Sequence, residues 1–247
     1  KPPPAPAKHA CDPNAVIESP TMQRGSPSRM HLVAIRPISA GDAVHMSYVD
    51  VATSRAERQA VLQERYGFTC ACALCERTRW IDPRTALWCT SCSEWSGSAA
   101  CGHRRIEPRA VDMGEDTDPN ILVHRTALAP PSHYRVWPLL FAAHTRAIER
   151  QAWDDAVQCT MLLCAGMQAR GARDARSALY PPGHPQRAVL LATLGRLLCE
   201  NVELHDTPSH LLARPLPCLS MLTDMTSRRF MAHTFLTQAL EEACIAF

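Results

Sequence analysis

The alternation of apolar and polar positions predicts a small β-region near the N-terminus. Residues 30–38 (MHLVAIRPI) and 43–51 (AVHMSYVDV) are short apolar or alternating runs, and the turn signal SAGD at 39–42 lies between them. β-Branched residues, alternation and an intervening turn are typical of paired strands. These residues therefore predict two short strands joined by a tight turn.

A helix is predicted next, over residues 53–66 (TSRAERQAVLQERY). Thr53 or Ser54 can cap its N-terminus, and Glu57 follows Ser54 by three positions, as in a capping box. The helix is expected to end just before a group of closely spaced cysteines.

From residue 134 onward the apolar positions recur with helical spacing. Helices are predicted over 134–151, 152–171, 184–201 and 226–247. Pro138 lies near the start of the first, Gly171 closes the second, and Pro185 lies in the first turn of the third. Paired helices with short breaks resemble tetratricopeptide-like hairpins, although no strict period of about 34 residues is present.

Together these elements predict an α+β protein with three regions. The strands and the first helix belong to residues 1–75, an irregular segment follows over 76–132, and an all-α domain occupies 133–247. A hydrophobic content of 46% predicts a substantial core for the 247 residues.

Charge and hydropathy argue against two classes of partner, nucleic acids and membranes. The formal net charge is +2, and no basic stripe is present, so we expect no direct contact with nucleic acid. No apolar run reaches the roughly 18 residues of a membrane span, and the N-terminus lacks the apolar run of a secretory signal. We therefore expect no membrane partner, and no feature of the sequence specifies an oligomeric state.

The twelve cysteines fall into two groups. Five lie in apolar helical contexts and are predicted to be small buried side chains: Cys159, Cys164, Cys199, Cys218 and Cys244. Seven lie among polar and turn residues in the first 101 positions: Cys11, Cys70, Cys72, Cys75, Cys89, Cys92 and Cys101. In a chain without a secretory signal, such spacing predicts metal binding rather than disulfides.

Spacing permits two arrangements of zinc ligands. The first is a local ribbon with the spacing C-x2-C-x13-C-x2-C, made of Cys72, Cys75, Cys89 and Cys92. The second has two sites: one of Cys11, Cys70, Cys72 and Cys75, and a weaker one of Cys89, Cys92, Cys101 and His103. The spacing alone does not choose between them.

The order of three motifs resembles a known family. HACDPN (9–14), GDAVHMSYVD (41–50) and RYGFTCACALC (65–75) resemble the C-terminal half of a SET domain with its post-SET zinc motif, as in the SET-and-MYND (SMYD-type) protein-lysine methyltransferases. Residues 178–198 are similar to the helical C-terminal region of that family, which carries a Pro-Gly-x-His-Pro element. The resemblance implies a partial SET β-fold followed by a tetratricopeptide-like helical domain.

The resemblance also implies an activity and a set of residues. Family members transfer a methyl group from S-adenosylmethionine to a lysine of a protein substrate, histones among them. Tyr48 matches the catalytic tyrosine and Tyr66 the second aromatic of the lysine channel. His9, Phe68 and Asn14 are the expected cofactor-binding residues. Location in the nucleus, the cytoplasm or both follows from the same analogy.

The family pattern also favours the second arrangement of zinc ligands. In the family, the cysteine of the first motif shares one zinc with the three cysteines of the post-SET motif. By that analogy Cys11, Cys70, Cys72 and Cys75 form one structural zinc site.

Two departures from the pattern bear on activity. Lys8 and Ala10 replace the Asn and Ser that flank the histidine in the family. The Gly-x-Gly turn and first strands of a SET domain precede this motif, whereas only ten residues precede Cys11 here. We therefore expect the chain to carry only the C-terminal half of the catalytic fold. The alternative is a catalytically inactive, zinc-stabilised scaffold that binds proteins.

Overall fold

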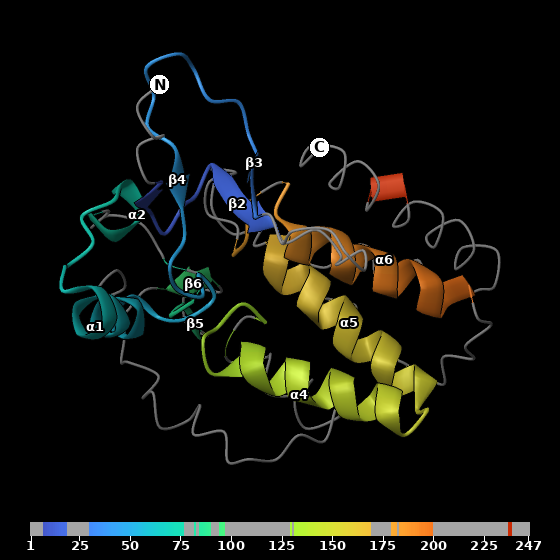
Figure 1. Cartoon of the computed structure of the whole chain (residues 1–247). Helices are drawn as coiled ribbons and strands as arrows, with labels where there is room; N and C mark the ends of the chain where they lie inside the picture. Colours follow the sequence, from blue (N-terminus) through green and yellow to red (C-terminus); the bar gives the residue numbers. More distant parts are fainter. Residues whose placement is uncertain are drawn as a thin grey trace.

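The computed structural model describes residues 7–18, 30–76, 82, 84–89, 94–96, 129, 131–168, 179–181, 183–199 and 237–238. The elements are β1 (Lys8–His9), β2 (Ala15–Glu18), β3 (His31–Ala34), β4 (His45–Met46), α1 (Arg55–Tyr66), α2 (Ala73–Glu76), β5 (Leu87–Cys89), β6 (Glu94–Ser96), α4 (Val136–Glu149), α5 (Trp153–Gln168) and α6 (Pro185–Cys199). Figure 1 shows α1 and α2 beside the short strands, with α4, α5 and α6 gathered on the other side. The described chain is therefore mixed α and β with little sheet.

The described sheet consists of three two-stranded ladders. β1 pairs with β4 in parallel, β2 pairs with β3 antiparallel, and β5 pairs with β6 antiparallel. The predicted hairpin over 30–51 is wrong, because β3 and β4 each pair with the N-terminal segment instead of with one another. That segment supplies both β1 and β2, and such long-range pairing leaves no local sequence signal.

The turn between those strands is nevertheless confirmed. The Asp42 amide donates to the Ser39 carbonyl at 3.0 Å, and Gly41 has a φ of +93°. Only glycine adopts that conformation without strain.

The first predicted helix is confirmed together with its capping box. Ser54 accepts from the Glu57 amide at 3.2 Å, and the Glu57 carboxylate accepts from the Ser54 amide at 2.9 Å. Gly67 ends α1 in the left-handed conformation, with φ at 73°. Both ends of α1 are thus fixed by local chemistry.

The next three predicted helices correspond to α4, α5 and α6. Pro138 is the third residue of α4, and Pro185 is the first residue of α6, where a missing amide hydrogen leaves no bond unmade. Gly171 lies outside the described residues, as does the fourth predicted helix except for residues 237–238. Among the described helices, none has the length and apolar character that a membrane crossing requires.

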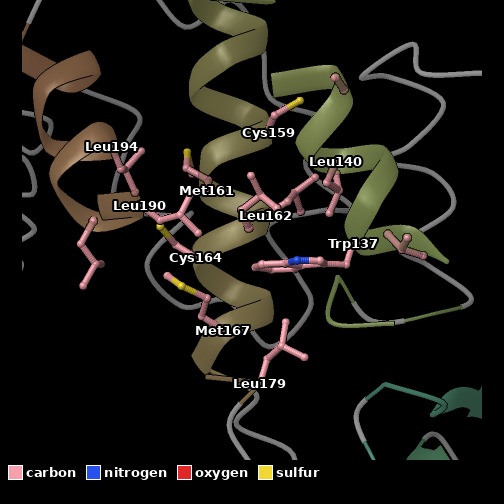
Figure 2. Packing of buried hydrophobic residues seen from close by; sticks show 14 of the residues in the cluster. Trp137, Leu140, Cys159, Met161, Leu162, Cys164, Met167, Leu179, Leu190 and Leu194 are labelled. Atoms are coloured by element: carbon pink, nitrogen blue, oxygen red, sulfur yellow. The ribbon is translucent and has the colours of Figure 1, made fainter. Parts of the chain in front are cut away.

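The main hydrophobic core lies between α4, α5 and α6. Figure 2 shows Trp137 and Leu140 of α4 facing Leu162 of α5, with Leu190 and Leu194 of α6 on the other side of α5. All five side chains are buried. Amphipathic helices of this length gain most of their stability from such contacts.

The five cysteines predicted to be buried in helices have different outcomes. Cys159 and Cys164 are confirmed as core residues, at 1% and 5% exposure. The prediction for Cys199 is wrong, because this last residue of α6 is exposed. Cys218 and Cys244 lie outside the described residues.

The segment predicted to be irregular, 76–132, contains local structure. β5 and β6 pair antiparallel, with Trp88 opposite Trp95, so the described part of this segment contains a short two-stranded ladder. Most other residues of the segment are outside the described part of the chain.

Buried contacts join the N-terminal region to the helices. Val51 and Ala52 belong to the main core. The Arg84 guanidinium donates to the carbonyls of Val51 and Leu179, the latter at 3.1 Å, and the Tyr180 hydroxyl donates to Asp50 at 3.3 Å. The residues that follow Tyr48 are therefore held against the helical part of the molecule.

Candidate functional site

Four cysteine side chains meet beside α1. The Sγ atoms of Cys11, Cys70, Cys72 and Cys75 all lie within 4.8 Å of one another. Cys11 comes from the N-terminal segment, and its sulfur is 3.6 Å from that of Cys75, 64 residues later in the chain. We call these four side chains the thiol cluster.

Local hydrogen bonds position the three cysteines that follow α1. The Gln59 side chain donates to the Cys70 carbonyl at 2.7 Å and accepts from the Cys70 amide at 2.8 Å. The amide of Cys75 then donates to the Cys72 carbonyl at 2.8 Å, which starts the short helix α2. This tight turn directs both sulfurs toward Cys11.

The geometry of the thiol cluster fits a tetrahedral zinc ion. Zn–S bonds of about 2.3 Å in a tetrahedron place the sulfurs about 3.8 Å apart. The Cys11 and Cys75 sulfurs are 3.6 Å apart, close to that value, and no two sulfurs of the set are more than 4.8 Å apart. Three of the four side chains are also buried, which suits a site closed to solvent.

Mutual contact shifts the pKa values within the thiol cluster. Hydrogen bonding with Cys72 and Cys75, together with burial, raises the pKa of Cys11. Hydrogen bonding with Cys11 and Cys75 lowers the pKa of Cys72, and burial raises the pKa of Cys70 to about 11. Crowded thiols do not all ionise unaided, so four thiolates together require a cation.

The four rings that the sequence analysis assigned to catalysis and cofactor binding also lie together. The Tyr48 ring is 5.0 Å from Tyr66, 5.3 Å from His9 and 6.5 Å from Phe68, centre to centre. His9 and Phe68 are 5.9 Å apart. Tyr66 is the most open of the four, with 48% of its surface exposed, whereas the others are half-buried. We call this group the ring cluster.

His9 connects the ring cluster to the thiol cluster. Its Nδ1 accepts from the Tyr48 amide at 3.1 Å, so in the neutral ring the proton is on Nε2. Nε2 lies 3.5 Å from the Cys11 sulfur. Burial lowers the pKa of His9, which favours this neutral form.

The hydroxyls of the two tyrosines have partners within the chain. The Tyr48 hydroxyl donates to the Ala7 carbonyl at 2.6 Å, and the Tyr66 hydroxyl donates to the Tyr48 carbonyl at 3.5 Å. The Tyr48 bond ties the ring to the start of β1.

The fifth predicted residue, Asn14, forms hydrogen bonds to the backbone with both the nitrogen and the oxygen of its side-chain amide. Its Nδ2 donates to the Ala43 carbonyl at 3.0 Å, and its Oδ1 accepts from the His45 amide at 2.7 Å. These bonds align β1 with β4. A contact of Asn14 with a cofactor stays a prediction.

The weaker metal site is described only in part. Cys89 is the last residue of β5, and the β5–β6 connection contains Cys92. Cys92, Cys101 and His103 lie outside the described residues, so the second site stays a prediction.

Sequence reasoning missed two buried arginines near the thiol cluster. Arg58 and Arg84 are each 1% exposed. Arg58 lies four positions before the buried Leu62, on the same face of α1, and that spacing was the available signal. Arg84 has no comparable signal, because its partners are distant in the sequence.

Sequence comparisons identify relatives of part of the chain. A SET and MYND domain-containing protein from Dictyostelium discoideum is 40% identical over 67 residues, which are 27% of this chain and 18% of that protein. The histone-lysine N-methyltransferase SET5 of Meyerozyma guilliermondii is 34% identical over 68 residues, 28% of this chain and 14% of the relative. The set5 enzyme of Schizosaccharomyces pombe, also a histone-lysine N-methyltransferase, is 36% identical over 67 residues, 27% of this chain and 20% of the relative.

The likeness is therefore local. Each match spans a fifth or less of the relative. No family model matches the chain. Over about a quarter of its length, this chain is similar to a SET and MYND domain-containing protein and to two histone-lysine N-methyltransferases of the SET5 type.

Proposed function

We propose that residues 1–75 form the C-terminal part of a SET-type protein-lysine N-methyltransferase site that uses S-adenosylmethionine. The observation that carries this proposal is the ring cluster: His9, Tyr48, Tyr66 and Phe68 come from three separate stretches of sequence and meet ring to ring. Plain core packing accounts less well for rings that remain half-buried or exposed.

The two tyrosines are suited to holding a lysine side chain. S-adenosylmethionine, when bound, supplies an electrophilic methyl group for attack by a neutral amine. Aromatic faces at Tyr48 and Tyr66 can pack along the aliphatic part of the lysine, and carbonyls and phenols can orient its amine. Because Tyr66 is 48% exposed, it lies where a protein substrate can enter from solvent. Alignment and exclusion of water are the main contributions such a site makes.

The cofactor would lie on the side of the ring cluster formed by His9 and Phe68. Asn14 supports that side by aligning β1 with β4. Lys8 is exposed in β1. Its ammonium can attract the carboxylate of the cofactor, but it repels the ammonium and sulfonium of the same molecule.

We further propose that the thiol cluster binds one structural zinc ion. Four thiolate ligands from the protein leave no open position for substrate, so the metal would hold the fold rather than take part in the reaction. In this arrangement zinc joins Cys11 to the loop that carries Cys70, Cys72 and Cys75. The ring cluster lies beside this junction through the contact of His9 with Cys11.

The wider assignments follow from the relatives. Two of them are named as histone-lysine methyltransferases, so we propose a protein lysine as substrate, with histones as the first candidates. Action in the nucleus or the cytoplasm is part of the same proposal. The division into regions 1–75, 76–132 and 133–247, with a tetratricopeptide-like helical tail and a second zinc knuckle, is also proposed.

The experiment is a calorimetric titration of S-adenosylmethionine into the zinc-loaded chain, followed by transfer of a radiolabelled methyl group to a histone mixture. Saturable binding that Phe68→Ala removes supports the cofactor site. Tyr48→Phe is then expected to reduce methyl transfer at least about tenfold, while loss of the bond to Ala7 lowers the unfolding midpoint by only about 2–4 °C. Unchanged turnover in Tyr48→Phe would remove Tyr48 from its assigned role.

A second candidate is a zinc-stabilised scaffold without catalysis. The observation in its favour is that the Tyr48 hydroxyl already donates to the Ala7 carbonyl at 2.6 Å. A zinc-loaded, folded chain that binds no S-adenosylmethionine supports this second function. The helical region would then be the place to look for protein partners.

A further inference from the structure

Arg58 of α1 contacts the thiol cluster from its buried side. The side chain is 1% exposed, and its Nε donates to the Cys11 sulfur at 3.3 Å. A second nitrogen of the same guanidinium donates to the Thr53 carbonyl at the start of α1. The cation is therefore enclosed between the helix and Cys11.

A buried guanidinium needs a negative charge close by. The described ion pairs are Arg36 with Asp12 and Arg84 with Asp82, and neither includes Arg58. Cys11, Asp82 and Cys75 are the groups whose charges act favourably on Arg58. Asp82 is already paired with the buried Arg84 at 3.1 Å. The sulfur atoms are thus the group in direct contact that can balance Arg58.

Metal binding would give the thiol cluster the required charge. Four thiolates carry more negative charge than a divalent zinc ion neutralises, so the loaded centre has a net negative charge. Without metal, mutual repulsion among the crowded sulfurs keeps some of them protonated, so the cluster carries less negative charge to balance the cation.

We propose that Arg58 is the charge-compensating residue of the zinc centre and that it helps the centre to retain the metal. This proposal rests on zinc binding by the thiol cluster. Cys11 is the one ligand that comes from outside the loop 70–75, so its bond to zinc has the least local support. The Arg58 contact holds this distant sulfur in place, in the way that partners behind metal ligands support their orientation and affinity.

The charge account predicts opposite effects in the two metal states. In zinc-loaded protein, Arg58→Met removes the balancing cation and should lower the unfolding midpoint. In metal-free protein, the same change removes a poorly balanced buried cation, so the midpoint should fall less or rise. A merely structural role, through the bond to Thr53, would lower both midpoints by the same amount.

The test uses the full chain and two measurements. The first is the unfolding midpoint of the zinc-loaded and chelator-treated forms under reducing conditions. The second is the transfer of zinc to the chromophoric chelator 4-(2-pyridylazo)resorcinol. Arg58→Met and Arg58→Gln are expected to weaken zinc retention by roughly 10- to 100-fold. Arg58→Lys, which keeps the charge, should stay nearer to the unaltered chain. Arg65→Met is the matched control, since Arg65 is exposed on the same helix.

The outcomes separate this proposal from the zinc site itself. Retention of zinc by Arg58→Met or Arg58→Gln at the level of Arg65→Met overturns the role of Arg58. Equal loss of stability in both metal states overturns it as well. If Arg58→Met does not fold, zinc retention is compared between Arg58→Gln and Arg58→Lys, and equal retention overturns the role of the Arg58 charge. A zinc content that Cys11→Ser leaves unchanged instead overturns the zinc site, and the role of Arg58 with it.

Discussion

Asn14 shows how one polar side chain can replace a missing strand contact. β1 and β4 are two residues long each, too short to hold a ladder by themselves. The amide of Asn14 bonds to the backbone at Ala43 and His45, and its own backbone amide donates to the His45 carbonyl at 3.1 Å. The N-terminal segment that carries His9 and Cys11 is held in place by these bonds.

Asn14→Ala should therefore destabilise the zinc-loaded chain. The change removes one donor and one acceptor from partly buried partners, and we expect a loss of about 1–3 kcal/mol in the free energy of unfolding. Asn14→Asp keeps the acceptor for His45 and should lose less. Urea unfolding measures both, and equal stability of all three proteins would contradict this role.

At the residue scale, the sequence predicted which residues form the site better than it predicted the residues that hold them in place. The spacing C-x-C-x-x-C and the ordered motifs pointed to the thiol and ring clusters, whose members do lie together. Arg58 was not predicted, because a single arginine on a polar helix is ordinarily a surface residue. Its burial depends on Cys11, which lies 47 positions away.

At the scale of elements, α4 and α5 approach closely at a glycine. A Cβ built on Gly166 would lie 3.0 Å from the Pro131 carbonyl carbon, the Ser132 nitrogen and a ring carbon of Trp137. Two of these atoms belong to the backbone and cannot rotate away. The glycine therefore permits the packing of α5 against the start of α4.

Gly166→Ala sets two effects against each other. Alanine favours a helix by about 1 kcal/mol over glycine. Overpacking against fixed atoms costs about 1–3 kcal/mol, so we expect a net loss of stability. Ala165→Gly, on the same helix, measures mainly the propensity effect, since Ala165 is only partly buried. Thermal unfolding that shows Gly166→Ala to be more stable than the unaltered chain would contradict the close packing.

His133 makes the start of α4 sensitive to acid. Its carbonyl accepts from the amides of Val136 and Trp137, and its ring is buried beside Tyr134. Burial, aided by Arg135, lowers the pKa of His133 from 6.5 to about 4. The unfolded chain therefore binds this proton at a higher pH than the folded chain does.

The contribution of neutral, buried His133 to the free energy of unfolding is fully present above pH 6.5 and is lost as the pH falls toward 4. Between pH 6.5 and pH 4, His133→Gln should reduce the change in the free energy of unfolding by about 1–3 kcal/mol. Denaturant unfolding at a series of pH values measures the slope. A variant with the same slope as the unaltered chain would show that His133 does not contribute.

Helices were predictable because their signals are local. The capping box of α1, Pro185 at the start of α6 and the helical spacing of apolar residues all lie within the element they define. The strand pairing was not: β3 and β4 lie within the predicted strands at 30–38 and 43–51, but each pairs with the N-terminal segment. β4 pairs with β1 across more than 35 residues, and no local pattern encodes that choice.

At the scale of the whole molecule, Arg84 joins three segments. Its guanidinium bonds to Val51, Asp82 and Leu179, and the Tyr134 amide donates to the Arg84 carbonyl at 2.9 Å. Arg84 is thus one of the buried side chains that fix the stretch after Tyr48 to the helical part of the molecule.

Two arginine–aspartate pairs in this chain allow a matched test of burial. Arg84 and Asp82 are 3.1 Å apart with Arg84 1% exposed, whereas Arg36 and Asp12 are 3.2 Å apart and both about a third exposed. Arg84→Met should cost about 3–5 kcal/mol, since it leaves buried partners unpaired. Arg36→Met should cost about 1 kcal/mol or less. Similar losses for both, measured by urea unfolding, would contradict the joining role of Arg84.

The central claim is that Cys11 shares one metal with Cys70, Cys72 and Cys75. The most direct test is the zinc content of the full chain and of single cysteine variants, measured by native mass spectrometry. We predict that Cys11→Ser loses one zinc ion and that Cys159→Ser, a change in the helical core, loses none. If Cys11→Ser keeps its full zinc content while Cys89→Ser loses the metal, the ligands belong to a local ribbon, and the account of this site is wrong.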